Sequence, residues 1–113
     1  MAVYANLSID QGTTFDSIIS VEGTNALPFD LSSYSVRGQI RKSYTSVTYT
    51  AFSASIVDAE LGQIGLALTS TQTAALKAGR YLYDVEVVHS ITGAVIRVLE
   101  GQVEINPRIT RIS

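Results

Sequence analysis

The chain of 113 residues contains no cysteine and no tryptophan, and it has a single histidine, His89. Without cysteine it can form neither a disulfide nor a thiolate metal site. With one histidine, which we place at a hairpin turn, we expect neither a multi-histidine metal site nor a histidine-based nucleophile triad. The residues therefore predict a protein without enzymatic activity, without a metal and without a cofactor.

Charge is also scarce in this sequence. Charged residues make up 16% of the chain, against roughly 25% in an average soluble domain. The formal net charge of −2 gives no overall field that would draw in nucleic acid or an anionic membrane. The hydrophobic share of 46% argues against disorder, and the remaining Ser, Thr and Gln suit a surface that packs against neighbours.

Long apolar segments are missing as well. No stretch approaches the roughly 20 apolar residues that a membrane-spanning helix needs. The first residues, Met1–Asn6, lack the basic and apolar regions of a secretory signal. We therefore expect a protein that is made in the cytoplasm and used without secretion.

Apolar and polar residues alternate with a period of two along most of the chain, and turn signals recur about every 8–12 residues. The clearest example runs from Tyr34 to Lys42, where Val36 and Ile40 share the apolar face. The pattern predicts one all-β domain over residues 1–113, a sandwich of seven to eight strands with one short helical turn. The other strands are expected at 3–9, 15–21, 52–56, 64–68, 81–88 and 95–105, the last alternating Val95, Arg97, Leu99, Gly101, Val103 and Ile105. An extended connection is expected around Pro28, and an edge strand or mobile hairpin at 44–53.

One segment has helical features. Thr69 and Gln72 have the spacing of a capping box. Residues 73–78 are mostly good helix formers, and Gly79 stands where a left-handed C-cap is expected. The segment predicts a helix of a few turns at most, which crosses between sheets.

The segment that follows this helix has the pattern of a tyrosine corner. In immunoglobulin-type sandwiches a short connection leads into a central strand, and a tyrosine hydroxyl bonds back to the backbone of that connection. Gly79 and Tyr81 are expected to form this structural corner, which makes the predicted sandwich immunoglobulin-like. Tyr81 as an acid or a ligand contact is the alternative.

Acidic residues could form a functional pair on the strand at 81–88. Asp84 and Glu86 lie two residues apart on one strand face, as a pair of carboxylates would. Their neighbours Arg80, Arg97 and Glu100 favour a solvated cluster of charges across strands instead.

Basic residues gather on the strand at 34–42. Arg37, Arg41 and Lys42 could contact phosphate. Because they alternate with Ser35 and Gln39, we interpret them as the solvent or interface face of a sheet.

Two regions have the features of contact surfaces. Residues 106–113 could form an extended arm that adds a strand to a neighbour's sheet, and a frayed terminus is the alternative. Aromatic residues in 44–53 are candidates for an interface, or else they cap the core. The expected interface residues are Tyr4, Tyr44, Tyr49, Phe52, Arg108, Ile109, Arg111 and Ile112.

Three segments resemble small virion proteins of tailed phages, in particular those that infect cyanobacteria. They are residues 1–15 (MAVYANLSIDQGTTF), 34–42 (YSVRGQIRK) and 76–86 (LKAGRYLYDVE). A similar plan marks the immunoglobulin-like N-terminal module of phage baseplate upper proteins. In this chain Ser33 stands where that plan has a glycine before Tyr34. The resemblance covers nearly the whole chain, and its motifs are mostly structural.

The resemblance implies a structural subunit of a phage virion. It would be a small assembly or adaptor subunit of the tail, baseplate or fibre attachment, or a capsid decoration (cement) subunit. Baseplate modules usually continue into further domains, so a chain of this length favours a stand-alone subunit. Expected partners are other virion proteins and copies of itself in a homo-oligomer, with no nucleic acid and no membrane. A module that binds carbohydrate or a host surface through Tyr44 and Tyr49 is the alternative, against which the lack of tryptophan counts; an enzyme is a third.

Overall fold

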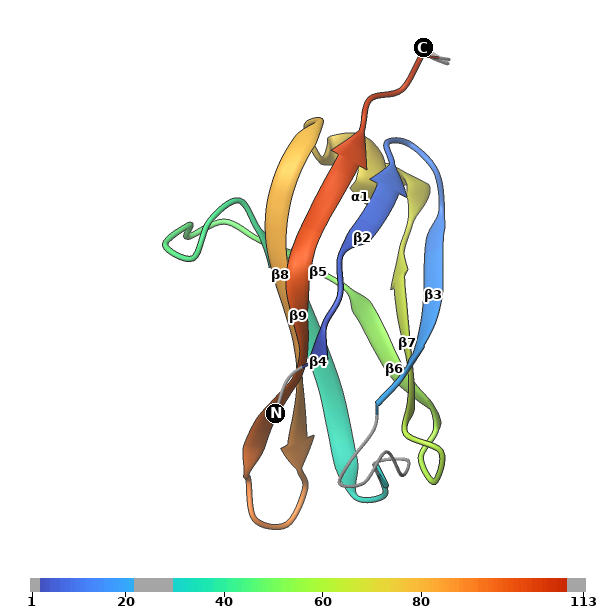
Figure 1. The fold of residues 1–113 in the computed structure, drawn as a ribbon, viewed down its shortest axis with the longest axis vertical. Helices are drawn as coiled ribbons and strands as arrows, with labels where there is room; N and C mark the ends of the chain where they lie inside the picture. Colours follow the sequence, from blue (N-terminus) through green and yellow to red (C-terminus); the bar gives the residue numbers. More distant parts are fainter. Residues whose placement is uncertain (1–2, 22–29, 110–113) are drawn as a thin grey trace.

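The computed structural model describes residues 3–21 and 30–109, which form two β-sheets packed face to face with one short helix at one end (Figure 1). The predicted all-β sandwich is confirmed, with nine strands in the described residues because two pieces of only two residues add to the expected count. The strands are β1 (Val3–Tyr4), β2 (Leu7–Asp10), β3 (Phe15–Ser20), β4 (Tyr34–Arg41), β5 (Thr50–Ala51), β6 (Ser53–Asp58), β7 (Gln63–Leu68), β8 (Gly79–His89) and β9 (Val95–Asn106). The helix α1 spans Ser70–Ala75.

The strand order is that of an immunoglobulin-like sandwich. The larger sheet has the order β1-β9-β8-β4-β5, and β2 pairs with β9 beyond β1. The N-terminal strands β1 and β2 run parallel to β9, and the other pairs are antiparallel. The smaller sheet has the order β3-β7-β6. In chain order, β3, β7 and β6 take the places of strands B, E and D of that fold, and β4, β8 and β9 those of C, F and G.

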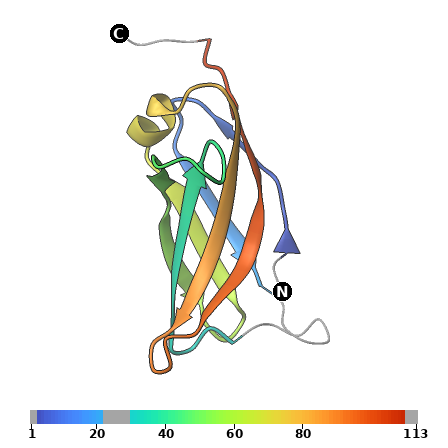
Figure 2. The same cartoon turned by 90° about the vertical axis from the view of Figure 1, so that its left-hand side faces the viewer.

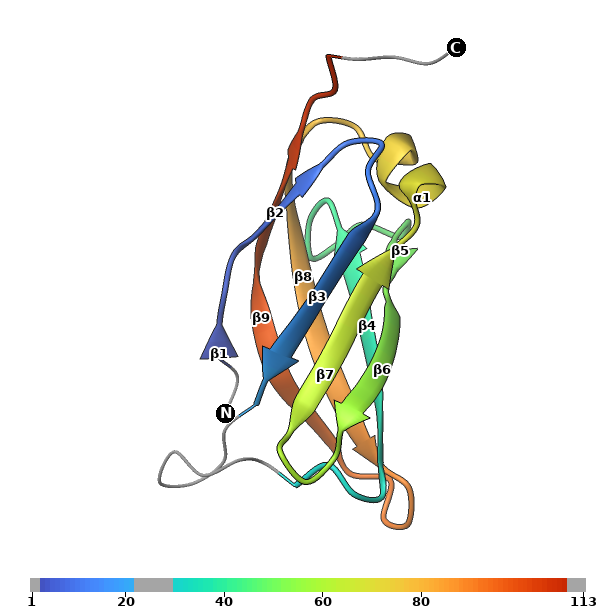
Figure 3. The same cartoon turned by 90° about the vertical axis from the view of Figure 1, so that its right-hand side faces the viewer.

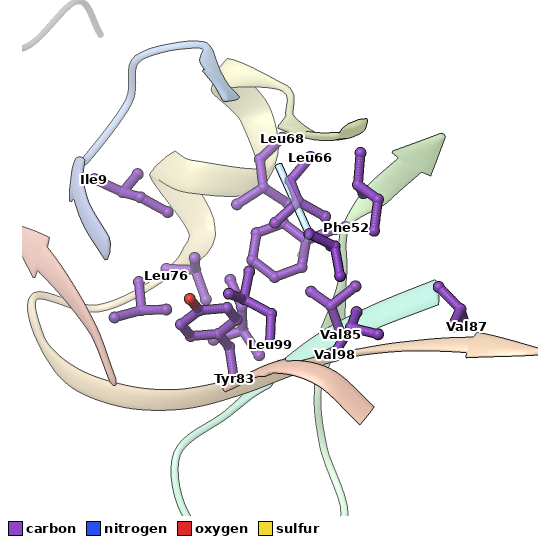
Figure 4. Packing of buried hydrophobic residues seen from close by; sticks show 14 of the residues in the cluster. Ile9, Phe52, Leu66, Leu68, Leu76, Tyr83, Val85, Val87, Val98 and Leu99 are labelled. Atoms are coloured by element: carbon purple, nitrogen blue, oxygen red, sulfur yellow. The ribbon is translucent and has the colours of Figure 1, made fainter. Parts of the chain in front are cut away.

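The core between the sheets is aromatic at its centre (Figure 4). The Phe52 ring packs against Phe15 and Tyr83, with centroids 6.3 and 6.0 Å away. Phe52 is only 6% exposed, so its expected role as an interface residue is wrong. The physical reason is the space above Gly38, where an added Cβ would lie 3.1 Å from the Phe52 ring. The remaining core residues are mostly inward apolar residues of both sheets, joined by Val21, Leu31 and Leu76 from the connections.

The last strand departs from the expected alternation. The register of β9 against β8 shifts between Arg97 and Leu99, so Val98 is the extra residue of a β-bulge. Val98 and Leu99 are both buried. Val95 and Arg97 therefore lie on the outer face, and not on the face of Leu99 as the regular pattern predicts. A bulge reverses the faces of all residues on one side of it, which counting alternate residues does not detect.

The predicted capping box is present. The Thr69 hydroxyl accepts a hydrogen bond from the Gln72 backbone nitrogen, and the Gln72 side chain accepts one from the Thr69 nitrogen. Gly79, however, is not the C-cap of this helix. Leu76 occupies the C-cap position in an extended conformation, and Gly79 begins β8 with a φ of 138°. The helix ends earlier than its composition indicates because the chain must extend to enter β8.

The tyrosine corner is confirmed. The Tyr81 hydroxyl donates a hydrogen bond of 2.8 Å to the carbonyl oxygen of Lys77, in the connection between α1 and β8. The Lys42 ammonium lies 4.8 Å from the centre of the Tyr81 ring and donates to the carbonyl oxygen of Arg80. Tyr81 therefore fixes how the connection enters the larger sheet, which is a structural role.

The turn before β4 shows why a glycine suits this position. The carbonyl oxygen of Leu31 accepts a hydrogen bond from the nitrogen of Tyr34, and Ser33 between them has a φ of 66°. This left-handed conformation costs a residue with a Cβ more than it costs glycine. The expected connection around Pro28 lies outside the described residues.

The N-terminal strands are fixed to the sheet by a buried tyrosine. Between β1 and β2 the carbonyl oxygen of Ala5 accepts a 2.6 Å hydrogen bond from the Tyr83 hydroxyl. The Ala5 carbonyl lies directly over Gly101, where any Cβ would overlap it. The Asn6 side chain accepts from the Gln102 nitrogen, so this strand donor stays paired. Burial, with a smaller contribution from Tyr4, raises the pKa of Tyr83 to about 12.

Candidate functional site: a polar groove on the larger sheet

The outer face of the larger sheet carries a hollow of about 720 Å³, a volume within the roughly 300–1,000 Å³ of small-molecule sites. Its floor consists of outward side chains of β9, β8 and β4, bounded by β1 on one side and by the loop after β4 on the other. This loop projects from the sandwich in Figure 1, and Figure 2 looks onto the larger sheet. We call this hollow the sheet groove.

The floor of the sheet groove is a regular array because its strands are in register. The central row crosses all four strands from β1 to β4, and one row lies on each side of it. The central row is Tyr4, Glu100, Asp84 and Gln39; the flanking rows are Gln102, Leu82 and Arg41, and Arg97, Glu86 and Arg37. With strands about 4.8 Å apart, the central row is roughly 14 Å long.

The sheet groove has no net formal charge, because its three arginines face three carboxylates. Arg37 Nε lies 3.0 Å from Glu86 Oε1, and Arg97 Nε lies 3.2 Å from Asp84 Oδ2. The predicted cross-strand cluster of charges is therefore confirmed for Arg97, whereas Arg80 lies 3.9 Å from Glu104 instead. Asp84 and Glu86 each pair with an arginine rather than with each other. Burial raises the pKa of Asp84, and the Arg97 charge opposes this shift.

The loop that bounds the sheet groove is held in place by Arg41. Its Nη1 donates a 2.5 Å hydrogen bond to the carbonyl oxygen of Ser46, and its Nη2 donates to Gln39 Oε1 at 2.9 Å. The guanidinium also lies 4.9 Å from the centre of the Tyr49 ring. Tyr49 thus supports the loop, and β5, which pairs with β4 directly after it, is the edge strand expected in this region.

Two exposed tyrosines stand at the margins of the sheet groove. Tyr4 on β1 is 63% exposed and Tyr44 in the loop is 82% exposed. Both line the groove, and neither side chain makes a hydrogen bond to any described residue. The structure therefore places two of the expected interface residues, one on β1 and one in the loop after β4, at the margins of the same groove.

Polar groups near Tyr4 are also unused by the fold. The Glu100 carboxylate and the Gln102 side-chain amide have no hydrogen bond or ion pair within the described part of the chain, although both line the sheet groove. One is an acceptor, and the other offers both donors and an acceptor. The Tyr4 end of the groove is therefore the part best equipped to bind a polar ligand.

The other expected interface residues lie away from the sheet groove. The nitrogen of Arg108 donates to Gln11 Oε1 at 3.2 Å, so the beginning of the C-terminal arm is attached to the turn after β2. Ile109, the last described residue, is 96% exposed. Arg111 and Ile112 lie outside the described residues.

Metal ligands could also come from the histidine and the acidic side chains. No three His, Asp or Glu side chains among the described residues are placed to hold a metal ion. His89 is the last residue of β8, and its Nδ1 accepts from the nitrogens of Ile91 and Thr92 in the turn that follows, so it lies at the hairpin turn as predicted. Nor does any helix in residues 3–21 and 30–109 have the length and apolar character to cross a membrane.

Sequence reasoning found most members of the sheet groove but not the groove. It placed Arg37, Arg41, Asp84 and Glu86 on outward faces, and Tyr4 and Tyr44 at an interface, but it placed Arg97 on the face of Leu99. It did not identify Gln102, and it did not join Tyr4 to the charged array. The missing fact is the pairing of β1 with β9, which the alternation of either strand does not specify.

Comparisons with known proteins add little to this geometry. No protein-family model matches the chain, and no curated protein matches it. One similar solved structure is that of InlP from Listeria monocytogenes, with 18% identity and a TM-score of 0.48 over 93% of this chain. This chain spans 28% of the length of that chain. So weak a likeness carries no argument about function.

Proposed function

We propose that the protein is a structural subunit of a phage virion, which binds a neighbouring virion subunit through the outer face of the smaller sheet. The proposed role in a virion is supported by the resemblance of residues 1–15, 34–42 and 76–86 to small virion proteins. The observation that supports the docking surface is the near absence of charge on the outer face of β3-β7-β6. The subunit could belong to the tail, baseplate, fibre attachment or capsid decoration.

Figure 3 turns the outer face of the smaller sheet toward the viewer. The outward residues of its strands are mostly uncharged. At its centre Ile18 on β3 pairs with Gly65 on β7, and Val57 lies 3.1 Å from where a Cβ of Gly65 would be. Ile18 is 61% and Val57 50% exposed. In the described strands of this sheet the charged outward side chains are Asp16 on β3 and Asp58, which follows a bulge on β6 and pairs with Gln63. The centres of protein interfaces are similarly depleted of charge.

This face is too small to hold a neighbour alone. Three strands of six residues cover roughly 10 by 20 Å, whereas a standard interface buries about 800 Å² on each partner. A second contact is therefore part of the proposal. The C-terminal arm, which leaves the sandwich fully exposed at Ile109, supplies it by adding to a neighbour's sheet.

The test asks whether purified particles contain the protein and whether its incorporation requires Ile18. Ile18→Glu places a charge at the centre of the outer face of the smaller sheet, which is costly to bury in an interface. Ile91→Glu is the matched control, because Ile91 is 82% exposed on the turn between β8 and β9. Each variant is supplied during phage growth, and the purified particles are analysed by quantitative mass spectrometry.

We expect the wild-type protein and Ile91→Glu in the particles, and at least a tenfold loss of Ile18→Glu. Circular dichroism and urea unfolding should show both variants folded, since both positions are exposed. Absence of the wild-type protein from purified particles contradicts the virion role. Equal incorporation of the two variants contradicts the docking surface.

A further inference from the structure

We infer that the sheet groove is a binding site for a short neutral oligosaccharide. This goes beyond the proposed role in assembly, since it concerns the opposite face of the sandwich and would hold for a subunit with any position in a particle. Four features of the groove support it: the charge balance, the exposed rings, the unused polar groups and the length.

The charge balance excludes ligands of high charge. Arg37 and Arg97 are already paired with carboxylates, and Arg41 is occupied by the loop that it holds. No cluster of free positive charge remains to bind phosphates or an acidic sugar. A floor of closely spaced, mutually neutralised donors and acceptors instead complements a ligand whose own groups are neutral hydroxyls.

The exposed rings supply the apolar part of sugar recognition. A pyranose ring has apolar C–H faces that stack on aromatic side chains, and tyrosine offers such a face together with a polar hydroxyl. Tyr4 and Tyr44 stand at the two margins of the groove, 63% and 82% exposed. The chain has no tryptophan, so tyrosine is the largest ring available for this contact.

The unused polar groups lie where a sugar on Tyr4 would extend over the floor. The Glu100 carboxylate accepts hydrogen bonds, and the Gln102 amide both donates and accepts. A hydroxyl that donates to a carboxylate forms a charge-assisted hydrogen bond, which is stronger than a neutral one. Because both side chains are unpaired within the described chain, no internal contact has to break when the ligand binds.

The dimensions fit a chain of sugars better than a single one or a peptide. The central row of roughly 14 Å accommodates a few linked rings between the two tyrosines. A peptide usually binds a sheet at its edge, through free backbone groups. The floor of the groove is centred on β8, whose backbone pairs with β9 on one side and with β4 on the other. β4 pairs with β5 only at Gln39 and Ile40, so a peptide added along the rest of that edge would lie beside the floor and not on it.

The test begins with binding of the purified protein to an array of neutral oligosaccharides: glucans, mannans, galactans and oligomers of N-acetylhexosamines. A heparin oligosaccharide on the same array reports binding of acidic sugars. Weak binding is measured by titrating the isotope-labelled protein with the best neutral oligosaccharide and following backbone amide shifts. We expect shifts at residues of the three floor rows and at Tyr44.

Two tyrosine variants and one control locate the site. Tyr4→Ala and Tyr44→Ala should each weaken binding about tenfold, the loss expected when one stacked ring is removed. Glu100→Gln, which keeps the side-chain shape, should weaken it severalfold. Val47→Ala changes an 89% exposed residue of the same loop that does not line the groove, and its affinity should equal that of the wild type.

Three results overturn the inference. The first is that no neutral oligosaccharide binds the wild-type protein more strongly than it binds the Tyr44→Ala variant. The second is a preference for the heparin oligosaccharide, which contradicts the neutral class. The third is binding that survives both tyrosine substitutions. The assembly proposal is tested apart from these results, because Tyr44→Ala should enter particles as the wild type does.

Discussion

The two outer faces of this sandwich differ in chemistry although they belong to sheets that share one core. The face of β9, β8 and β4 carries most of the charge of the described strands, on side chains paired across strands. The face of β3-β7-β6 is built around Ile18, Gly65 and Val57 and is nearly without charge. Long polar side chains around a hollow can bind a small polar ligand, whereas a nearly uncharged face loses little hydration against another protein. One small fold can thus present two outer faces of different chemistry.

Phe52→Ala should have the largest effect on stability, because this side chain contacts both sheets. Deleting a buried phenylalanine side chain costs about 3–5 kcal/mol, and Phe52 is only 6% exposed. The free energy of unfolding, measured with urea, should fall by this amount and both faces should be lost in one transition. Tyr44→Ala, at an exposed ring, should change it by less than about 0.5 kcal/mol. Two separate transitions in Phe52→Ala would show that the faces do not depend on a common core.

Gly101→Ala and Gly65→Ala compare the two sheets by the same change. At Gly101 the new Cβ overlaps the backbone oxygen of Ala5, whereas at Gly65 its closest contacts are the side chains of Val57 and Ser55, 3.1 and 3.3 Å away. We expect Gly101→Ala to cost about 1–3 kcal/mol and Gly65→Ala clearly less. Hydrogen exchange should show the Ala5 amide, which donates to the Glu100 carbonyl, losing protection only in Gly101→Ala. Equal losses in the free energy of unfolding would contradict this difference between backbone and side-chain contacts.

Tyr83→Phe tests how the margin of the groove formed by β1 is attached. Removing the hydroxyl leaves the Ala5 carbonyl unpaired, which should cost about 1 kcal/mol at neutral pH. The folded state raises the pKa of Tyr83 from 10.0 to about 12, so it favours the neutral phenol. This contribution is complete below pH 10 and is lost as the pH rises toward 12. Urea unfolding of both proteins over this range should show a steeper loss for the wild type. If the free energies of unfolding of the two proteins fell in parallel with pH, the stabilising role of the neutral Tyr83 hydroxyl would be contradicted.

The Arg37–Glu86 pair should have the smallest effect. Their side chains are 61% and 29% exposed, so solvent screens the pair. A double-mutant cycle with Arg37→Gln and Glu86→Gln should give a coupling of no more than about 1 kcal/mol, and added salt should reduce it. A larger, salt-independent coupling would mean that the groove floor contributes to the stability of the fold, and not only to its surface.

The parts of the fold that could be predicted are those set by neighbouring residues. The faces of β4 are correct because one side of this strand meets the core and the other meets water along its whole length. The capping box at Thr69 and the corner at Tyr81 are correct because each involves residues within four positions of one another. Such features depend on local geometry, which sequence spacing fixes.

The wrong predictions concern residues whose position depends on a contact with a segment distant in the sequence. Val95 and Arg97 lie on the opposite face because a bulge at Val98 shifts the register against β8. Phe52 is in the core because Gly38, on another strand, leaves it room. Gly79 begins a strand because pairing of its segment with β9 outweighs continuation of a short helix.

The lack of a disulfide, the alternation of the strands and the outward position of most charges follow from the residues alone. That Tyr4 joins the charged array, and that Tyr44 stands across from it, depends on how the strands pair. The reason is that a period of two defines which face a residue occupies but not which strand lies beside it. That choice is made by contacts such as Asn6 with Gln102, 96 residues apart, which form when the whole core assembles.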